Sequence, residues 1–259
     1  MSVQFREISA YRELLWNLVL TELKLRYRDS LLGFLWTILN PLFSLLILSF
    51  VFSKIIRFQV PHFTIFLFSG LASWFMIQQT AVIAIGSIVN NQSLIKKIYV
   101  PKIVFPLSNV LARFVDHGVL LVLLVGFMPV FGVRMGWSLL FLPVAVALHF
   151  AFALGLALLL TTAQVRVRDT QNVAGIVFQA FFYLTPIIYP LEVLPESLRP
   201  YFVLNPFYLF VRMIREPVWG GVVPGVGAVA AAAGLAAVTL AAGLWVFGRK
   251  EKHFVYYLS

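Results

Sequence analysis

The sequence predicts an all-α integral membrane protein with six transmembrane helices. Hydrophobic residues make up 61% of the 259 positions and charged residues only 12%, whereas a soluble domain carries about 25% charged residues. The mean hydropathy is +0.93. Six apolar segments approach or exceed the ~20 residues that a helix needs to cross the hydrocarbon: Leu31–Ser53, Phe63–Val89, Val104–Phe131, Trp137–Ala163, Val173–Pro190 and Val222–Phe247.

The residues before the first span predict an amphipathic helix in the plane of the membrane interface. At 100° per residue, one face is apolar and carries Phe5, Ile8, Leu15, Trp16, Val19 and Leu23. The opposite face is polar and carries Arg6, Glu13, Asn17, Thr21 and Lys24. The basic junction that follows, Lys24–Asp29, cannot enter hydrocarbon, where each charge costs about 2.5–3.5 kcal/mol. We expect no cleavable signal peptide, because no short apolar region with a small-residue cleavage site is present.

The distribution of Lys and Arg predicts that both chain termini are cytoplasmic. With that orientation, the cytoplasmic side holds Arg6, Arg12, Lys24, Arg26, Arg28, Lys96, Lys97, Lys102, Arg166, Arg168, Arg249, Lys250 and Lys252. The outer side holds only Lys54, Arg57, Arg134, Arg199, Arg212 and Arg215. An excess of basic residues in the cytoplasmic loops is what sets the orientation of a multi-span protein.

The inner loop Asn90–Lys102 predicts a short basic helix that ends before Pro101. We expect its apolar residues Leu94, Ile95 and Ile98 to be exposed, and exposed apolar residues on a cytoplasmic loop favour a contact with another protein. The alternative is a helix that lies on anionic headgroups, and both can hold.

The outer connection Leu191–Gly221 predicts two short helices that dip into the outer leaflet and meet near Asn205-Pro206. The segment contains four prolines, yet its stretch LRPYFVLNPFYLFVRMI is too apolar for a solvated loop. Irregular backbone at that depth must be buried in protein or line a wet cavity.

The sixth span carries small residues four positions apart, which allow two helix backbones to approach closely. The pairs are Ala230 with Gly234 and Thr239 with Gly243. We expect them to pack within one chain, in preference to a contact between two copies.

Two spans carry a polar stripe along one face. On the first span the stripe contains Ser30, Gly33, Thr37, Asn40, Pro41 and Ser44. On the fifth it contains Asn172, Gly175, Gln179, Phe182, Tyr183, Pro186 and Pro190. Because lipid-facing positions should be apolar, these stripes predict either the wall of a translocation path or polar packing between helices.

The third span contains Arg113, Asp116 and His117. Arg113 and Asp116 are three residues apart, so they share a helix face and can pair. We favour a structural ion pair that avoids lipid, and a proton or ion site is the alternative.

No catalytic motif is present. The sequence has no G-x-x-x-x-G-K-[ST] phosphate loop, no H-E-x-x-H and no G-x-S-x-G, so we expect no nucleotide hydrolysis by this chain alone. The absence of Cys excludes disulfides and thiolate metal sites. The net charge of +10 follows from basic loops between apolar spans and does not indicate a nucleic-acid partner.

Two stretches resemble the membrane subunits of type-2 ABC exporters that move polysaccharides. They are RYRDSLLGFLWTILNPL and YLTPIIYPLEVLPESLRPYFVLNPFYLFVRMI, and the resemblance extends over essentially the whole chain. It is greatest to the Wzm-type O-antigen permeases, with capsule and teichoic-acid permeases as near relatives.

The resemblance implies a single permease domain in the bacterial cytoplasmic membrane. Its parts are an interface helix (1–29), five spans (31–190), an outer gate (191–221), the sixth span (222–247) and a cytoplasmic tail (248–259). The implied gate residues are Tyr189, Pro190, Asn205, Pro206, Phe207 and Tyr208. The implied channel wall consists of Ser30, Gly33, Thr37, Asn40, Ser44, Asn172, Gln179, Phe182 and Tyr183.

The resemblance also implies partners. The permease would be a homodimer joined to two copies of an ATPase subunit, which binds ATP and Mg²⁺, while this chain holds no cofactor. The docking segment would be Asn91, Gln92, Ser93, Leu94, Ile95, Lys96 and Lys97. The cargo would be a glycan on undecaprenyl diphosphate, and Arg26 and Arg28 are candidates to contact the pyrophosphate, although positive-inside anchoring explains both arginines equally well.

Two alternatives remain at this point. The first is a type-2 permease for another cargo, such as a drug, a lipid or haem. The second is a proton-coupled secondary transporter that uses Asp116 and His117, although no inverted repeat is visible.

Overall fold

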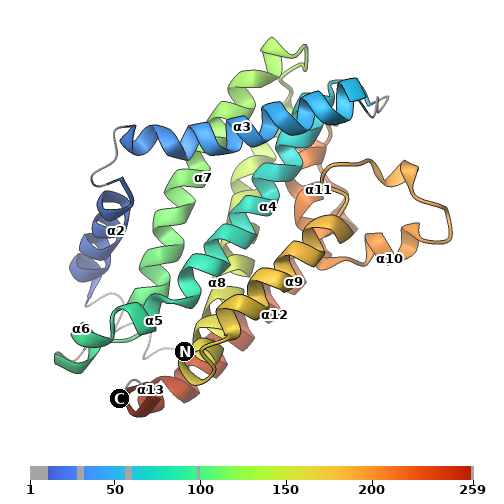
Figure 1. Cartoon of the computed structure of the whole chain (residues 1–259). Helices are drawn as coiled ribbons and strands as arrows, with labels where there is room; N and C mark the ends of the chain where they lie inside the picture. Colours follow the sequence, from blue (N-terminus) through green and yellow to red (C-terminus); the bar gives the residue numbers. More distant parts are fainter. Residues whose placement is uncertain (1–10, 28–31, 56–59, 98–99, 258–259) are drawn as a thin grey trace.

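The structure is a computed structural model that describes residues 11–27, 32–55, 60–97 and 100–257. All regular elements in these residues are helical (Figure 1). In chain order they are α2 (Arg12–Tyr27), η1 (Gly33–Leu35), α3 (Trp36–Phe50), η2 (Val51–Ile55), α4 (Phe63–Ile85), α5 (Ser87–Asn90), α6 (Gln92–Lys97), α7 (Val104–Val130), η3 (Trp137–Phe141), α8 (Leu142–Arg166), α9 (Thr170–Leu184), η4 (Leu191–Val193), α10 (Arg199–Val203), α11 (Pro206–Val218), α12 (Val226–Lys250), η5 (Glu251–His253) and α13 (Phe254–Tyr257).

Five helical segments of the described chain are long and apolar enough to cross a membrane, and they coincide with five of the six predicted spans. They are Trp36–Ser53, Phe63–Ile85, Val104–Val130, Trp137–Arg166 and Val226–His253. The remaining predicted span, Val173–Pro190, corresponds to α9. The 15 residues of α9 extend about 22 Å, which is less than the ~30 Å of hydrocarbon.

The early end of α9 has a local cause. Thr185 is extended, with φ −103° and ψ 132°, and Pro186 follows it. A residue before proline is disfavoured in the α region, so the helix ends at Leu184, before the predicted boundary at Pro190.

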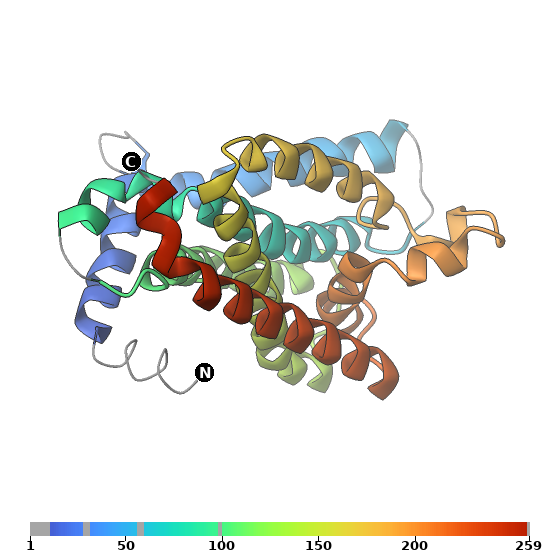
Figure 2. The ribbon, with the colours of Figure 1, turned by 90° about the horizontal axis from the view of Figure 1, so that it is seen from below.

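Helix α4 is the centre of the bundle. It contacts α3, α7, α8, α9 and α11, and in Figure 2 α3 and α9 lie on one side of it while α12 lies on the other. Apart from Gln78 and Gln79, its sequence is apolar or small, which is the pattern of a helix buried on most of its surface. Most of its residues are buried, and among them Ile65, Leu67, Ala72 and Ala81 have no exposed surface.

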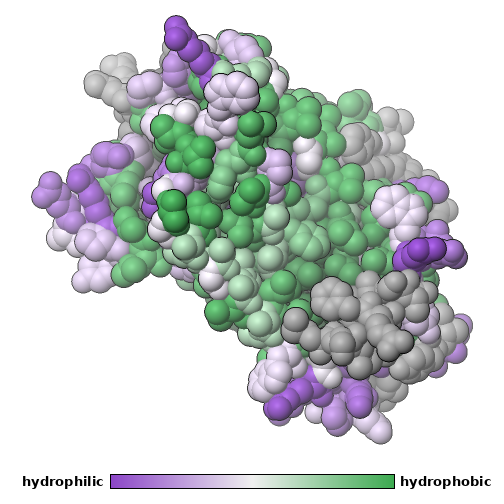
Figure 3. All heavy atoms as spheres, turned by 180° about the vertical axis from the view of Figure 1, so that it is seen from behind, coloured by the Kyte–Doolittle hydropathy of each residue, from purple (hydrophilic) through white to green (hydrophobic). Residues whose placement is uncertain are grey.

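The ends of the bundle differ in charge and in shape. Helices α5, α6 and α13 lie at one end, and α10 lies at the other (Figure 1). We call the first the basic end, because it carries Lys96, Lys97, Lys102, Arg166, Arg168, Arg249, Lys250 and Lys252. Between the ends, a broad hydrophobic surface covers the face seen in Figure 3.

The predicted N-terminal helix is present as α2 and packs on α7. Val19, from the predicted apolar face, is 1% exposed, whereas Trp16 of the same face is 60% exposed. Asn109 of α7 donates a hydrogen bond from Nδ2 to Glu22 Oε1 of α2, at 3.3 Å. Helix α2 is therefore attached to the bundle by one side, while Trp16 remains available to lipid.

Helices α8 and α12 approach each other through glycine. A Cβ atom at Gly155 would lie 2.5 Å from the Thr239 carbonyl carbon, and one at Gly243 would lie 2.6 Å from the Gly155 oxygen. The prediction that Thr239 and Gly243 pack within one chain is therefore confirmed. At Gly234, by contrast, an added Cβ would meet no atom within 4 Å.

We predict that Gly155→Ala destabilises the protein by about 1–3 kcal/mol, because the added methyl group would overlap the backbone of α12. Gly234→Ala is the matched control and should be neutral or slightly stabilising, since alanine favours a helix interior over glycine. The thermal unfolding midpoints of the two variants in detergent, compared with that of the wild-type protein, measure both changes in stability. Equal midpoints for the two variants would contradict the close contact.

Candidate functional site

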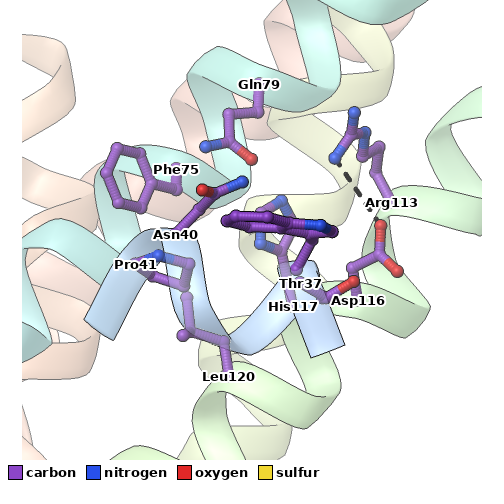
Figure 4. Close-up of a pocket in the computed structure, with 10 residues that line it drawn as sticks. Thr37, Asn40, Pro41, Phe75, Gln79, Arg113, Asp116, His117 and Leu120 are labelled. Atoms are coloured by element: carbon purple, nitrogen blue, oxygen red, sulfur yellow. Dashed lines mark ion pairs between the residues drawn. The ribbon is translucent and has the colours of Figure 1, made fainter. Parts of the chain in front are cut away.

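A polar pocket lies within the spans between α3, α4 and α7 (Figure 4). Its volume is about 320 Å³, and it is lined by Trp36, Thr37, Asn40, Pro41, Phe75, Gln79, Arg113, Asp116, His117 and Leu120. The amide side chains of Asn40 and Gln79 lie on one side of it, and the side chains of Arg113 and Asp116 lie on the other (Figure 4). The pocket therefore combines uncharged hydrogen-bonding groups, a charged pair and aromatic faces.

The predicted pair of Arg113 and Asp116 is confirmed and belongs to this pocket. Arg113 Nη1 lies 3.6 Å from Asp116 Oδ2, and the side chains are 18% and 4% exposed. A charged side chain within a span is costly unless it pairs or faces the protein interior. His117 is also buried, and its ring meets that of Phe114 edge-on, with centroids 6.1 Å apart.

The pocket joins two sets of residues that the sequence placed in separate predictions. Thr37 and Asn40 come from the predicted stripe of the first span, and Arg113 and Asp116 come from the third span. Ser44 does not line the pocket and donates its hydroxyl to Asn40 O at 3.1 Å. Gly33 begins η1.

The predicted stripe of the fifth span lies elsewhere. Asn172, Gln179 and Tyr183 are exposed on α9. Phe182 is half-buried, and its ring lies 5.7 Å from that of Trp74 on α4. Both helices contact α4, and the described residues that line the pocket beside α3 include none from α9.

Two of the predicted site residues, Arg28 and Ser30, lie outside the described residues. Arg26 is in the last turn of α2, and its side chain lies outside the described part of the structure.

The predicted short basic helix is present as α6, and its docking role stays a prediction. Ile95, which was expected to be exposed, is only 8% exposed and packs in a core cluster with Val100, Val104 and Phe254. Leu94 is partly buried against the same cluster. The outer face of α6 therefore consists of its exposed residues, which are Gln92, Ser93, Lys96 and Lys97.

Helix α11 closes the opposite end of the bundle. Asn205 is its N-cap and accepts a hydrogen bond from the Phe207 backbone N–H at 2.9 Å, as a capping residue does. Its Nδ2 also donates to Leu184 O at 3.1 Å and to Thr185 Oγ1 at 3.0 Å. The predicted hinge residue thus joins the end of α9 to the start of α11.

Phe207 follows the cap and is buried among aromatic rings. Its ring centroid lies 4.9 Å from that of Phe181, 5.3 Å from Trp74 and 6.0 Å from Phe178. Pairs at such distances contribute beyond their buried area. Two short helices, α10 and α11, are present in the segment predicted to contain them, and their depth in the membrane stays a prediction. Helix α11 packs on α4, α8 and α12, whereas Tyr201 of α10 is 70% exposed.

Sequence reasoning missed the most buried cation of this region, Arg215. It donates from Nη1 to Pro186 O at 2.6 Å and from Nη2 to Ile187 O at 2.7 Å, and its guanidinium lies 3.8 Å from the Phe66 ring centroid. An arginine side chain keeps its charge in proteins, so these carbonyls and the Phe66 ring surround a buried cation. The available signal was its position on a helix face with Val211, four residues before it, and Val218, three residues after it.

Arg215 holds the turn after α9 against α4. Gly70 of α4 makes room for it, because a Cβ atom there would lie 2.2 Å from Arg215 Nη2 and 3.0 Å from Ile187 O. The predicted gate residue Tyr189 continues this turn and donates its hydroxyl to Tyr183 O at 2.7 Å. The predicted gate residues Pro190 and Tyr208, which lie on either side of α10 in the chain, are half-buried.

Polar and charged groups that line a pocket between apolar helices of membrane-spanning length are typical of a membrane transport protein. Comparison with known families agrees with this class. The profile of the family described as ABC-2 type transporter matches residues 13–219, so the chain belongs to this family.

Individual relatives narrow the comparison. An O-antigen export system permease protein, RfbA, of Myxococcus xanthus is 31% identical over 251 residues, which are 96% of each chain. An RfbA protein of Klebsiella pneumoniae is 31% identical over 202 residues, 78% of each chain. The polysialic acid transport protein KpsM of Escherichia coli is 27% identical over 251 residues, 91% of this chain and 92% of KpsM. The resemblance to polysaccharide-export permeases is thus confirmed. The chain is a multi-pass membrane protein, and in bacteria the membrane is the inner one.

We predict that Arg215→Met loosens the turn after α9, because the carbonyls of Pro186 and Ile187 lose buried donors worth about 1–3 kcal/mol. Hydrogen exchange of the backbone amides in residues 185–189 should be at least about fivefold faster. Arg212→Met is the control, since Arg212 pairs with Glu216 on its own helix. Unchanged exchange in the Arg215 variant would contradict the anchoring role.

Proposed function

We propose that this chain is the transmembrane subunit of an ATP-driven exporter of lipid-linked polysaccharide. The observation that carries the proposal is similarity along nearly the whole chain to O-antigen and polysialic acid transport proteins. The proposal places six crossings in the membrane, with α9 and the turn after it forming the fifth. Both termini face the cytoplasm, because the basic end carries the excess of Lys and Arg.

The functional unit in this proposal is a homodimer. Helices α3 and α9 both lie on one side of α4 (Figure 2), and α9 exposes both polar and apolar side chains there, Asn172, Gln179 and Ile176 among them. The exposed apolar residues of α9 are suited to packing against a second copy of the chain, whereas its exposed amide side chains are suited to lining a water-filled channel. A second copy that covers this face would let the stripes of α3 and α9 from two chains enclose one channel.

The channel would carry the glycan without reading its sequence. Trp36, Asn40 and Gln79 offer an aromatic face and amide groups, and Phe182 and Tyr183 offer aromatic faces on α9. Aromatic rings provide broad apolar contact with a polar edge, and amides exchange hydrogen bonds with successive hydroxyl groups. In this role the Arg113–Asp116 pair keeps the pocket polar without a net charge.

Energy would come from a separate ATPase subunit, in two copies, which holds ATP and Mg²⁺. This chain supplies the docking surface, which consists of the exposed residues of α6, and Ile95 transmits movement to the bundle because it is packed in the core beside α7. Closure of the ATPase pair then pushes α6, and the first and fifth spans part.

The carrier and the gate complete the proposal. The cargo is a glycan on undecaprenyl diphosphate, and Arg26 and Arg28 at the start of the first span would meet the pyrophosphate at the membrane surface. At the opposite end, α10 and α11 form a re-entrant outer gate in which Tyr189, Pro190, Asn205, Pro206, Phe207 and Tyr208 take part.

Reconstitution tests the function directly. Proteoliposomes that hold the permease together with the ATPase encoded beside it should export a lipid-linked glycan only when ATP and Mg²⁺ are supplied. Vesicles with the permease alone should export none, because the chain has no nucleotide-binding motif. Glycan export by the permease alone would refute the proposal, and ATP-driven export of a drug or haem instead of glycan would reassign the cargo.

We predict that Lys96→Glu with Lys97→Glu abolishes co-purification of the ATPase, because the exposed face of α6 reverses its charge while Ile95 stays in the core. The control is Arg168→Glu with Lys252→Glu, which makes the same charge change at the same end on exposed residues outside α6. An intact complex in the first variant would refute the docking assignment. Equal loss of the ATPase from both variants would show a general effect of charge at this end and no specific docking role for α6.

A further inference from the structure

At the basic end, the chain tail encloses a pocket that the proposed function does not use. Phe254 of α13 is 2% exposed and packs edge-on against Phe247 of α12, with ring centroids 5.3 Å apart. This contact turns the tail back across the end of α8, which α13 contacts. We call the enclosed space the tail pocket.

The tail pocket has the size of a small-ligand site. Its volume is about 410 Å³, within the range of about 300–1,000 Å³ that such sites occupy. It is lined by Leu159, Thr162, Ala163, Val165, Arg166, Val167, Val246, Lys250, His253, Phe254 and Tyr257.

One part of the tail pocket is basic. Arg166 is the last residue of α8 and Lys250 is the last residue of α12, and His253 follows in η5. Among the described residues that line the pocket, none is a carboxylate. Helix C-termini also present carbonyl groups that favour cations over anions, so it is the side chains that make this site suitable for a negative group.

The other part of the tail pocket is apolar and leads toward the middle of the bundle. Leu159 lies about two turns before Arg166 on α8, and Val246 lies about one turn before Lys250 on α12. Further toward the middle of the bundle, α8 and α12 carry mainly apolar residues. A free phosphate ion would leave this apolar part unfilled, whereas an amphiphile would fill both parts.

We propose that the tail pocket binds an anionic phospholipid, with its phosphate between Arg166 and Lys250 and an acyl chain along α8 and α12. Basic pockets between transmembrane helices on the cytoplasmic side are suited to acidic headgroups. The proposal depends on the cytoplasmic orientation of the basic end, and it does not depend on the cargo. The bound lipid would fasten the tail to the ends of α8 and α12.

Native mass spectrometry of the purified full-length permease tests the site. The protein is titrated at low salt with phosphatidylglycerol or with phosphatidylcholine of the same acyl chains. Arg166→Gln with Lys250→Gln should weaken phosphatidylglycerol binding roughly 30-fold, since each basic side chain near a membrane surface contributes about fivefold. The matched control is Arg168→Gln with Lys252→Gln, which removes the same charge from exposed residues that do not line the pocket.

The expected result is a large loss for the lining variant, a small loss for the control, and weak binding of phosphatidylcholine throughout. Excess inorganic phosphate should fail to displace the lipid. Equal losses in the two variants, equal binding of the two lipids, or displacement by phosphate would each overturn the proposal. So would a lining variant that keeps the lipid but no longer binds the ATPase, because the pocket would then be a protein contact.

Thermal unfolding of both variants without added lipid shows whether they fold. Added phosphatidylglycerol should raise the midpoint of the wild-type protein and of the control by mass action, and it should leave the midpoint of the lining variant unchanged. An equal rise in all three would overturn the proposal.

Discussion

Hydrocarbon offers no hydrogen-bond partner, so each polar group in the spans must find one inside the protein. His149 of α8 shows how this works. Its Nδ1 lies 2.7 Å from Ala145 O and must donate to that carbonyl, so Nε2 accepts from the Ser73 hydroxyl of α4, at 2.8 Å. Nearer the basic end, Thr161 donates to Ala84 O at 2.7 Å. Polar links that lipid cannot replace thus join α8 to α4 at two depths.

Arg215 applies the same constraint to irregular backbone. The helix ends before Pro186, so the carbonyls of Pro186 and Ile187 in the turn after α9 have no helical N–H group as a hydrogen-bond partner. The guanidinium of α11 supplies both donors, and Gly70 supplies the space. A full charge is kept inside the protein because it satisfies two carbonyls and lies on the face of Phe66.

The sequence was a good guide where the interactions are local. The spans follow from runs of apolar residues, and the Arg113–Asp116 pair follows from a spacing of three residues on one helix. It was a poor guide where the partner is distant. The acceptors of Arg215 lie 28 and 29 residues away, so its role could not be read from its neighbours. Ile95 was misjudged because a helix of six residues is too short for periodicity to define its buried face.

The two polar stripes show the same limit in another way. Periodicity finds which residues share a face of a helix, but the rotation of that helix in the bundle depends on packing. Thr37, Asn40 and Pro41 of the first stripe line a pocket with α7, whereas Asn172, Gln179 and Tyr183 of the other are exposed on α9. Pro186 and Pro190, which were predicted to continue that stripe, lie beyond the end of α9. The sequence therefore grouped residues by helix face without showing what each face meets.

The uneven burial of the spans separates a fixed part of the molecule from parts that can move. Helix α4 buries 17 of its 23 residues, whereas α3 buries only Leu45 of its 15. Helix α9 likewise buries only Ala174 and Phe178, so within one chain α3 and α9 are far less buried than α4. The end of α9 is fixed through Asn205 and Arg215. In the proposed export cycle, a push on the basic end would move α3 and α9 as the walls of the channel, while α4 stays packed in the core.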